Sequence, residues 1–338
     1  MKAKKLFSAI ALAMGFTVLT ACTDVGATFT LGEYWKQNSL HNDEVHEVLT
    51  YDVSFEASEG MNNLGYTLDY SNGSYKTVLK SETKDGEIIY RYSTAFSIGV
   101  TYTCNGNTKE FTDTIATEVL FHNAQKKLQP ISSTKTTLSH SPMLGEGQTS
   151  PDSCYSVFHQ TVTTTYAADG ASGTCEVIDL TKKETEQGYK TTDSFEKGKK
   201  LTLFDNEQLL VAMRAFGAST TSAKAEVYQQ VVSNTQKVKF TFTESDEEEG
   251  RQFSLKFLEG SVDEALLAET EATKKNITYR TVSIVLDETN PGSTQTAWVA
   301  TGDTTKNTYR NMLLHLETPL SYGIGTLTYT LSGVARLK

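Results

Sequence analysis

The chain is short of the residues that mark several common protein classes. Cysteine occurs only four times in 338 residues, so the body must rely on an apolar core rather than on disulfide bridges. Basic side chains are also scarce, 31 against 41 acidic ones. An acidic surface repels phosphate backbones, which argues against nucleic-acid binding. After residue 21 no apolar run reaches the roughly 20 residues of a membrane-spanning helix, and we expect a soluble body.

Motifs for catalysis or metal binding are missing as well. The six histidines form no H-E-x-x-H pair, and neither G-x-S-x-G nor a Gly-rich phosphate loop occurs. The loose S-x-x-K pattern occurs three times, but without the S-D-N and K-T-G partners of a penicillin-binding site. We therefore predict no metal site, no cofactor and no enzymatic activity.

The first 22 residues carry the clearest motif in the chain. Three lysines precede the apolar run 6–19, which leads into Leu19-Thr20-Ala21-Cys22. This order resembles the bacterial lipoprotein signal, which implies cleavage before Cys22 and a diacylglycerol on its sulfur. Two acyl chains hold a soluble domain on a membrane almost permanently. The resemblance implies an extracytoplasmic protein anchored to the cell membrane by lipid, on a Gram-positive surface or on a periplasmic side.

The signal divides the chain into a signal peptide at 1–21, a lipidated polar tether at 22–44 and a β-rich domain at 45–338. Because the signal holds three lysines and no acidic residue, the total charge of −10 becomes −13 for the mature chain. Three other cysteines remain, which allow one disulfide in any of three pairings. They are Cys104, Cys154 and Cys175.

Period-two alternation predicts antiparallel strands through most of the domain. Apolar and polar side chains alternate over 49–55 and over 64–70, as in a strand with one buried face. We predict a meander over 45–200, less regular at 122–155, and a second meander over 225–338. Three dipeptides in the first meander have the residue types of two-residue hairpin turns, namely Asn72-Gly73, Asp85-Gly86 and Asn105-Gly106.

Between the two meanders, residues 205–216 predict a helix. Asp205 can cap its amino end with Gln208 at the reciprocal position of a capping box, and Gly217 follows its carboxyl end. Its apolar surface is broad and needs cover, most naturally from the concave side of the sheet. A second short helix is expected over 261–270.

This order of elements resembles the lipoprotein carriers of the LolA and LppX type. The resemblance covers element order and no diagnostic motif. It implies a mainly β fold, a curved antiparallel half-barrel with one or two short helices and a hydrophobic ligand between sheet and helix. Two β-sandwich-like domains are the alternative architecture. The closing segment 307–331 resembles that of uncharacterised Gram-positive lipoproteins, which implies no activity.

Tyrosines supply a second indication of a binding site, because seven of the sixteen fall between Tyr51 and Tyr102. Rows of aromatic side chains on a sheet pair across strands, stack on sugars or line an apolar cavity. The candidate ligand-binding residues in the tyrosine rows and the helix are Tyr66, Tyr70, Tyr90, Tyr92, Leu209, Met213 and Phe216.

We therefore expect a non-enzymatic membrane lipoprotein that binds a hydrophobic ligand, a glycan or a partner protein, and no nucleic acid. A structural or assembly module of the cell envelope, with no small ligand, is the first alternative. An exported hydrolase whose catalytic residues converge from distant strands is the second.

Overall fold

The computed structural model describes Leu31, Trp35 and residues 45–123, 127–144, 147–198, 201–217, 220–230, 233–244, 251–254, 256–257, 274–277, 279–285, 294–301, 312–320 and 323–336. The expected signal peptide, Cys22 and the expected helix over 261–270 lie outside these residues.

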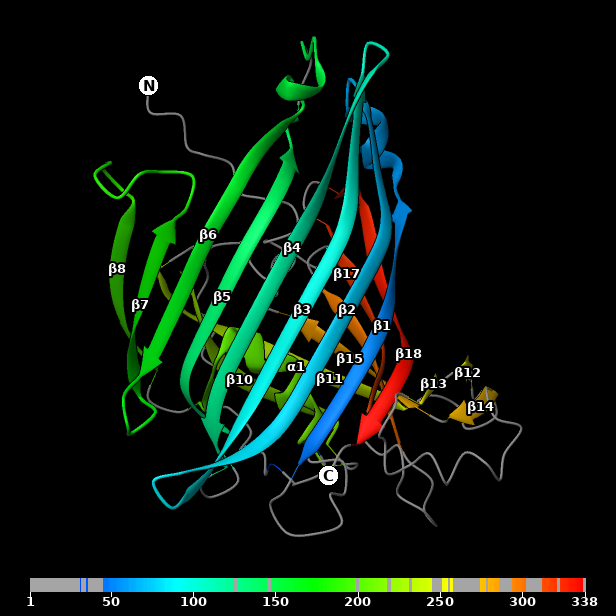
Figure 1. Cartoon of the computed structure of the whole chain (residues 1–338). Coiled ribbons are helices and arrows are strands. Elements are labelled where there is room, and N and C mark those ends of the chain that lie inside the picture. Colours follow the sequence, from blue (N-terminus) through cyan, green and yellow to red (C-terminus); the bar gives the residue numbers. More distant parts are fainter. Residues whose placement is uncertain are drawn as a thin grey trace.

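Sixteen strands in the described part of the chain join into one sheet that curves around a single short α-helix (Figure 1). Most of them pair as antiparallel neighbours. The strands of this sheet are β1 (His46–Ala57), β2 (Thr67–Lys84), β3 (Glu87–Cys104), β4 (Asn107–His122), β5 (Gln129–Pro142), β6 (Tyr155–Tyr166), β7 (Ser172–Asp179), β8 (Lys190–Glu196), β9 (Leu203–Phe204), β10 (Ser222–Gln229), β11 (Asn234–Glu244), β13 (Lys256–Phe257), β15 (Tyr279–Val285), β16 (Gln295–Ala300), β17 (Leu313–Pro319) and β18 (Gly325–Arg336). A separate pair consists of β12 (Arg251–Ser254) and β14 (Lys274–Ile277).

The sheet order makes one layer of the two predicted meanders. It runs β8-β7-β6-β5-β4-β3-β2-β1-β18-β17-β16-β15-β11-β10-β9, with β13 paired to β18. The first strand therefore pairs with the last, antiparallel, from Glu47 opposite Arg336 to Ala57 opposite Gly325. This confirms the mainly β curved sheet with a helix on its concave side. The alternative of two β-sandwich domains is wrong, because a single hydrogen-bonded sheet carries both meanders.

Two of the three predicted hairpin turns are confirmed, and the third is a bulge. Asp85-Gly86 joins β2 to β3 and Asn105-Gly106 joins β3 to β4, with positive φ at all four residues. Asn72-Gly73 lies instead inside β2, where the register against β3 shifts between Ser71 and Ser74. Asn72 has the left-handed φ of 51° that a bulge accepts as readily as a turn. A Cβ on Gly73 would lie 2.6 Å from the Val53 carbonyl oxygen.

Strand β5 is regular where the sequence suggests irregular structure. Pro130 and Pro142 stand near its two ends, where the missing amide hydrogens cost little. Its buried positions include Ser133, Thr137 and Ser139, so hydroxyl side chains face the core and no apolar alternation is visible.

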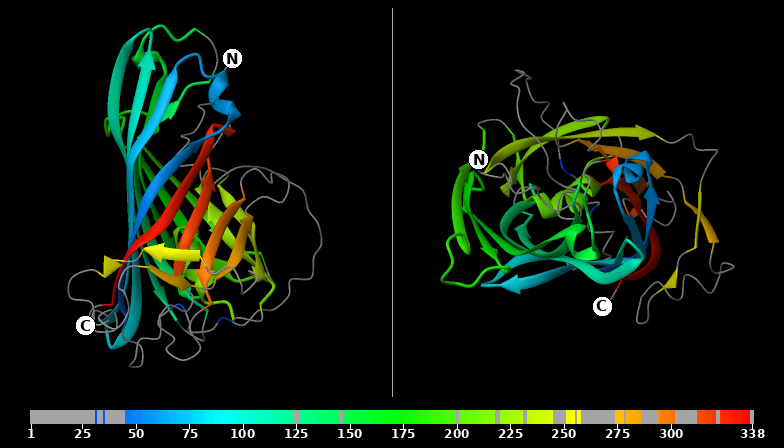
Figure 2. Two further views of the ribbon diagram at one scale, coloured as in Figure 1. Left: turned by 90° about the vertical axis from the view of Figure 1, so that its right-hand side faces the viewer. Right: turned by 90° about the horizontal axis from the view of Figure 1, so that it is seen from above.

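The two ends of the sheet meet through side chains. The Phe195 ring on β8 stacks on the Tyr228 ring on β10, with centroids 4.1 Å apart. The Ser233 hydroxyl donates to the Asp193 carboxylate at 2.8 Å, and the Gly198 amide donates to Glu226 at 2.6 Å. Seen from above, the sheet encircles the helix almost completely (Figure 2).

The long strands carry two apolar clusters on one face. Even-numbered residues of β3 are buried from Tyr90 to Cys104, except for the half-buried Thr94, and alternate strand residues share a face. The lower core lies near the Asp85-Gly86 turn and contains Tyr90, Tyr92 and the helix. The upper lobe, near the Asn105-Gly106 turn, is covered by the 3-10 turns η2 (Glu59–Asn63) and η4 (Pro151–Ser153) (Figure 1). Its buried residues include Tyr66, Tyr70, Tyr102, Cys104 and Cys154.

Leu31 and Trp35 belong to the lower core, although the sequence assigns both to the polar tether. Leu31 forms an isolated antiparallel bridge with Phe216. Trp35 is completely buried, with its ring edge against Tyr90 at 4.7 Å and Phe121 at 5.4 Å between centroids. The folded domain therefore includes residues well before Val45.

Replacing Trp35 tests how much this segment stabilises the domain. Removing a buried indole leaves a cavity, so we expect Trp35→Ala to lower the free energy of unfolding by about 3–5 kcal/mol. Trp35→Phe should cost distinctly less because it keeps most of the ring contacts. Urea unfolding followed by circular dichroism measures both, and a loss below about 0.5 kcal/mol for the alanine variant would show that the segment is dispensable.

Candidate functional site

Helix α1 (Leu209–Arg214) lies inside the curve of the sheet, within the predicted range 205–216 but beginning later than predicted. It continues from the 3-10 turn η5 (Asn206–Gln208), which has the expected capping box. The Asp205 carboxylate accepts the Glu207 amide hydrogen at 2.8 Å, and the Gln208 side-chain oxygen accepts that of Asp205 at 3.4 Å. The α-helix ends at Arg214, two residues earlier than predicted.

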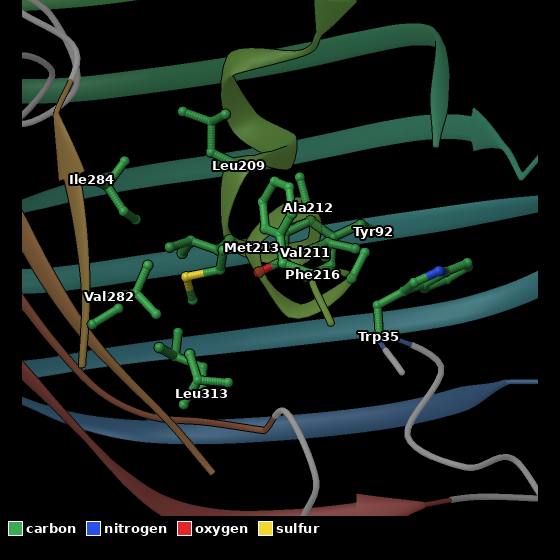
Figure 3. Close-up of a cluster of buried hydrophobic side chains, with 14 of the residues drawn as sticks. Trp35, Tyr92, Leu209, Val211, Ala212, Met213, Phe216, Val282, Ile284 and Leu313 are labelled. Carbon is green, nitrogen blue, oxygen red and sulfur yellow. The ribbon is translucent and has the colours of Figure 1, made fainter. Parts of the chain in front are cut away.

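This helix is enclosed on every side, so the predicted hollow beneath it is filled. All six residues of α1 are buried, and so is Phe216. Met213 points towards Val282 of β15 and Leu313 of β17 (Figure 3). The Phe216 ring lies 5.2 Å from Phe240 and 5.3 Å from Phe242 between centroids. Where the resemblance implies a hydrophobic ligand, the protein has its own packed core.

The structure divides the candidate ligand-binding residues between two places. Tyr90 and Tyr92 join Leu209, Met213 and Phe216 in the lower core, as expected of a wall facing a helix. Tyr66 and Tyr70 lie instead in the upper lobe. Tyr70 stands opposite Val100 on β3, eight residues beyond Tyr92, or about 26 Å at 3.3 Å per residue. A small ligand cannot contact both groups.

A buried ion pair ties the end of the helix to the first strand. The Arg214 guanidinium donates to both Glu47 carboxylate oxygens, at 2.8 and 3.0 Å, and each side chain is 3% exposed. Burial alone would lower the pKa of Arg214, but the Glu47 carboxylate outweighs burial and the pKa is raised. A paired arginine and glutamate can therefore remain charged inside an apolar core.

Tyrosines complete the polar group around this ion pair. The buried Tyr51 hydroxyl donates to the Leu313 carbonyl at 2.9 Å, which links β1 to β17 across the core. Burial raises the pKa of Tyr92 to about 12, and it raises that of Tyr51 well above its usual value. Both hydroxyls thus keep their protons at neutral pH, and that of Tyr51 acts as a hydrogen-bond donor.

The upper lobe contains a second buried pair, Asp113 and His140. The carboxylate of Asp113 accepts the His140 backbone amide hydrogen at 3.0 Å and lies 2.7 Å from the ring Nδ1. The imidazole stacks on Phe111 at 3.9 Å between centroids, and the Tyr102 hydroxyl donates to the His140 carbonyl at 2.6 Å. A histidine oriented by a carboxylate supplies two of the three groups of a hydrolytic triad. Within the described residues no serine, threonine or cysteine side chain hydrogen-bonds its ring. The bonds between Asp113 and His140 link β4 to β5.

Sequence reasoning did not identify either buried pair. Glu47 and Arg214 are 167 residues apart, and Asp113 and His140 belong to strands whose pairing was not predicted. The one available signal was the arginine at the end of an otherwise apolar helix, which must find a carboxylate if the helix is buried.

Comparison with known proteins identifies no relative: no family model, curated protein or solved structure matches the chain. Among the described residues, no three histidine, cysteine, aspartate or glutamate side chains are grouped to hold a metal ion. The helices in the described part are too short or too polar to cross a membrane.

The Glu47–Arg214 pair can be tested by a double-mutant cycle. Leaving one charge of a buried pair unpaired costs about 3–5 kcal/mol, so we expect Arg214→Met to destabilise the protein by that amount. The double variant Glu47→Gln/Arg214→Met should lose less than the single one, because no charge is left uncompensated. The more exposed Lys190–Glu176 pair is the control, and Lys190→Met should cost less than about 1 kcal/mol. Equal losses for Arg214→Met and Lys190→Met in urea unfolding would contradict this role.

Proposed function

We propose that the chain is a lipid-anchored, extracytoplasmic and non-enzymatic binding protein that presents its upper lobe to another protein of the cell envelope. The observation that carries the proposal is that the lower core, which is joined to the expected anchor, and three exposed apolar side chains of the upper lobe lie at opposite ends of the sheet. The lipoprotein-type signal at 1–22 supports the anchor.

The anchored end follows from the position of Leu31 and Trp35 in the lower core. Leu31 follows Cys22 by only nine positions, and an extended chain of that length spans at most about 30 Å. The lower core is thus held near the membrane surface. Cys104 lies 14 residues along β3 from Tyr90, about 46 Å farther at 3.3 Å per residue. This length allows the upper lobe to extend away from the bilayer.

Burial of the tyrosines argues against a glycan or lipid ligand at the predicted residues. Tyr66, Tyr70, Tyr90 and Tyr92 are all less than one-tenth exposed, so their ring faces are not free to stack on a sugar. The packed side chains around α1 leave the lower core to the protein itself.

Exposed apolar side chains favour a protein partner at the upper lobe. Met143 and Leu144 follow the end of β5 and Val157 lies near the start of β6, and each of the three is more than two-fifths exposed. We call these three residues the apolar patch. A contiguous exposed apolar patch marks a contact site between proteins, and we propose that these three residues form one. The half-buried Tyr155 ring, whose hydroxyl donates to Asp152 at 3.0 Å, adds an aromatic and polar neighbour.

The anchor is tested by removing the sulfur that would carry the lipid. We expect Cys22→Ser to release the protein into the medium or the periplasm, because a hydroxyl cannot accept the diacylglycerol and no acyl chain then holds the domain. Fractionation and immunoblotting compare it with Cys104→Ser, which should stay with the membrane. Retention of both variants would contradict a lipid anchor.

The partner is tested by site-specific photocrosslinking on membranes. A photoreactive residue at Leu144 is expected to capture one defined protein, and the same residue at exposed Ile88, near the lower end, should not. Leu144→Asp should reduce capture by a probe placed at Val157. Equal crosslinking from Leu144 and from Ile88 would contradict the proposal. So would a stoichiometric amount of non-covalently bound lipid extracted from the purified protein.

A further inference from the structure

Two of the three remaining cysteines meet in the upper lobe. Cys104 is the last residue of β3 and Cys154 directly follows η4, and both side chains are buried in the same cluster. The Cys104 thiol donates to the Gln148 carbonyl at 3.4 Å, and the Cys154 thiol donates to the Ser150 carbonyl at 3.3 Å. Burial and a hydrogen bond between the two thiols raise the pKa of Cys154 to about 11. The two side chains therefore share one buried cluster and lie within reach of each other.

Cys175 belongs to another part of the molecule. It is buried on β7 in a cluster with Tyr166, Phe195 and Tyr228, close to the seam between the ends of the sheet. Of the three pairings that the sequence allows, the structure brings together the sulfurs of only one. All three cysteines are free thiols in this structure.

We propose that Cys104 and Cys154 are a disulfide-forming pair in the exported protein, and that Cys175 stays a thiol. The bond would fasten Cys154 and the preceding turn η4, which covers part of the upper lobe, to the end of β3. Three hydrogen bonds already hold the residues on either side of η4: Met143 amide to Cys154 carbonyl at 2.8 Å, Tyr66 hydroxyl to Met143 carbonyl at 3.0 Å, and Asn105 side chain to Thr149 carbonyl at 3.1 Å. The disulfide thus fixes the backbone that carries the apolar patch.

Oxidised glutathione, a small disulfide, serves as the oxidant in the balanced reaction. One cysteine thiolate attacks a glutathione sulfur, forms a mixed disulfide and releases the first glutathione thiolate. The second cysteine thiolate then attacks the protein sulfur of that mixed disulfide and releases the second glutathione. The two cysteines lose two electrons and two protons, and the small disulfide becomes two thiols. Because both sulfurs are buried, the reaction should occur while the chain folds.

In the cell, an oxidising compartment would supply the small disulfide that serves as oxidant. This part of the inference rests on the proposed export. The test uses an added oxidant, so its result does not depend on where the protein resides. Failure of the disulfide and failure of the lipid anchor are therefore separate outcomes.

The pairing is tested on the purified full-length protein carrying Cys22→Ser, which removes the remaining thiol, refolded from urea with oxidised and reduced glutathione. After quenching and denaturation, free thiols are labelled with a maleimide and located by peptide mass spectrometry. We expect label at Cys175 alone, and at Cys104, Cys154 and Cys175 after reduction. Cys175→Ser should show no label at Cys104 or Cys154 before reduction. Label at all three cysteines without reduction, or a disulfide peptide that includes Cys175, would overturn the proposal.

The stabilising effect of the Cys104–Cys154 disulfide is tested by thermal unfolding of the oxidised and reduced forms. We expect the oxidised parent to melt about 5 °C or more above the reduced parent, because the bond restricts a long loop of the unfolded chain. The double variant Cys104→Ser/Cys154→Ser should show no difference between the two conditions. An equal Tm for both forms of the parent would show that the disulfide does not stabilise the fold.

Discussion

Burial of helix α1 inside the curved sheet is the constraint on which the rest of the structure depends. A helix that is apolar around its whole circumference is stable only when it is surrounded, and one flat sheet can cover only one side of it. The sheet therefore curves until its first and last meanders both contact the helix, with β3 on one wall and β15 to β17 on the other. Arg214 closes the end of the helix, and its burial requires Glu47.

The length of the strands explains why the same sheet also builds the upper lobe. Strands β2 and β3 have 18 residues each, far more than a six-residue helix and its neighbours can cover. Their remaining apolar face needs other cover, which η2, η4 and the turn between β17 and β18 provide through Leu64, Cys154 and Ile324. The molecule thus has two ends with different environments. The lower end is packed around Leu31 and Trp35. The upper end carries the apolar patch of Met143, Leu144 and Val157.

Local sequence signals predicted those features that depend on neighbouring residues. The helix cap at Asp205, two of the glycine turns and the many antiparallel strands are of this kind, whereas the curvature of the sheet was implied by the resemblance to lipoprotein carriers. The Asn72-Gly73 bulge was misassigned because a turn and a bulge require the same left-handed backbone. Strand β5 was missed because its buried positions are occupied by serine and threonine, and only the neighbouring strands show that they face a core.

Long-range pairing explains the remaining differences between expectation and structure. The sequence analysis assigned Trp35, with its polar neighbours, to a tether. No local feature of the sequence indicates that its ring is buried in the lower core. Five of the candidate ligand-binding residues do share one buried cluster around the helix, but periodicity cannot tell a cavity from a packed interior. That difference depends on side-chain volumes from eight or more strands, which come together only in the folded sheet.

Hydrogen exchange of the peptide that covers residues 209–216 tests the packed interior most directly. If the helix is a permanent part of the core, its amides should exchange as slowly as those of β3, and only through global unfolding. The exposed edge strand β8 provides the fast reference within the same experiment. Exchange of the helix at the rate of β8, in the absence of denaturant, would mean that α1 opens like a lid and that the interior is not a packed core.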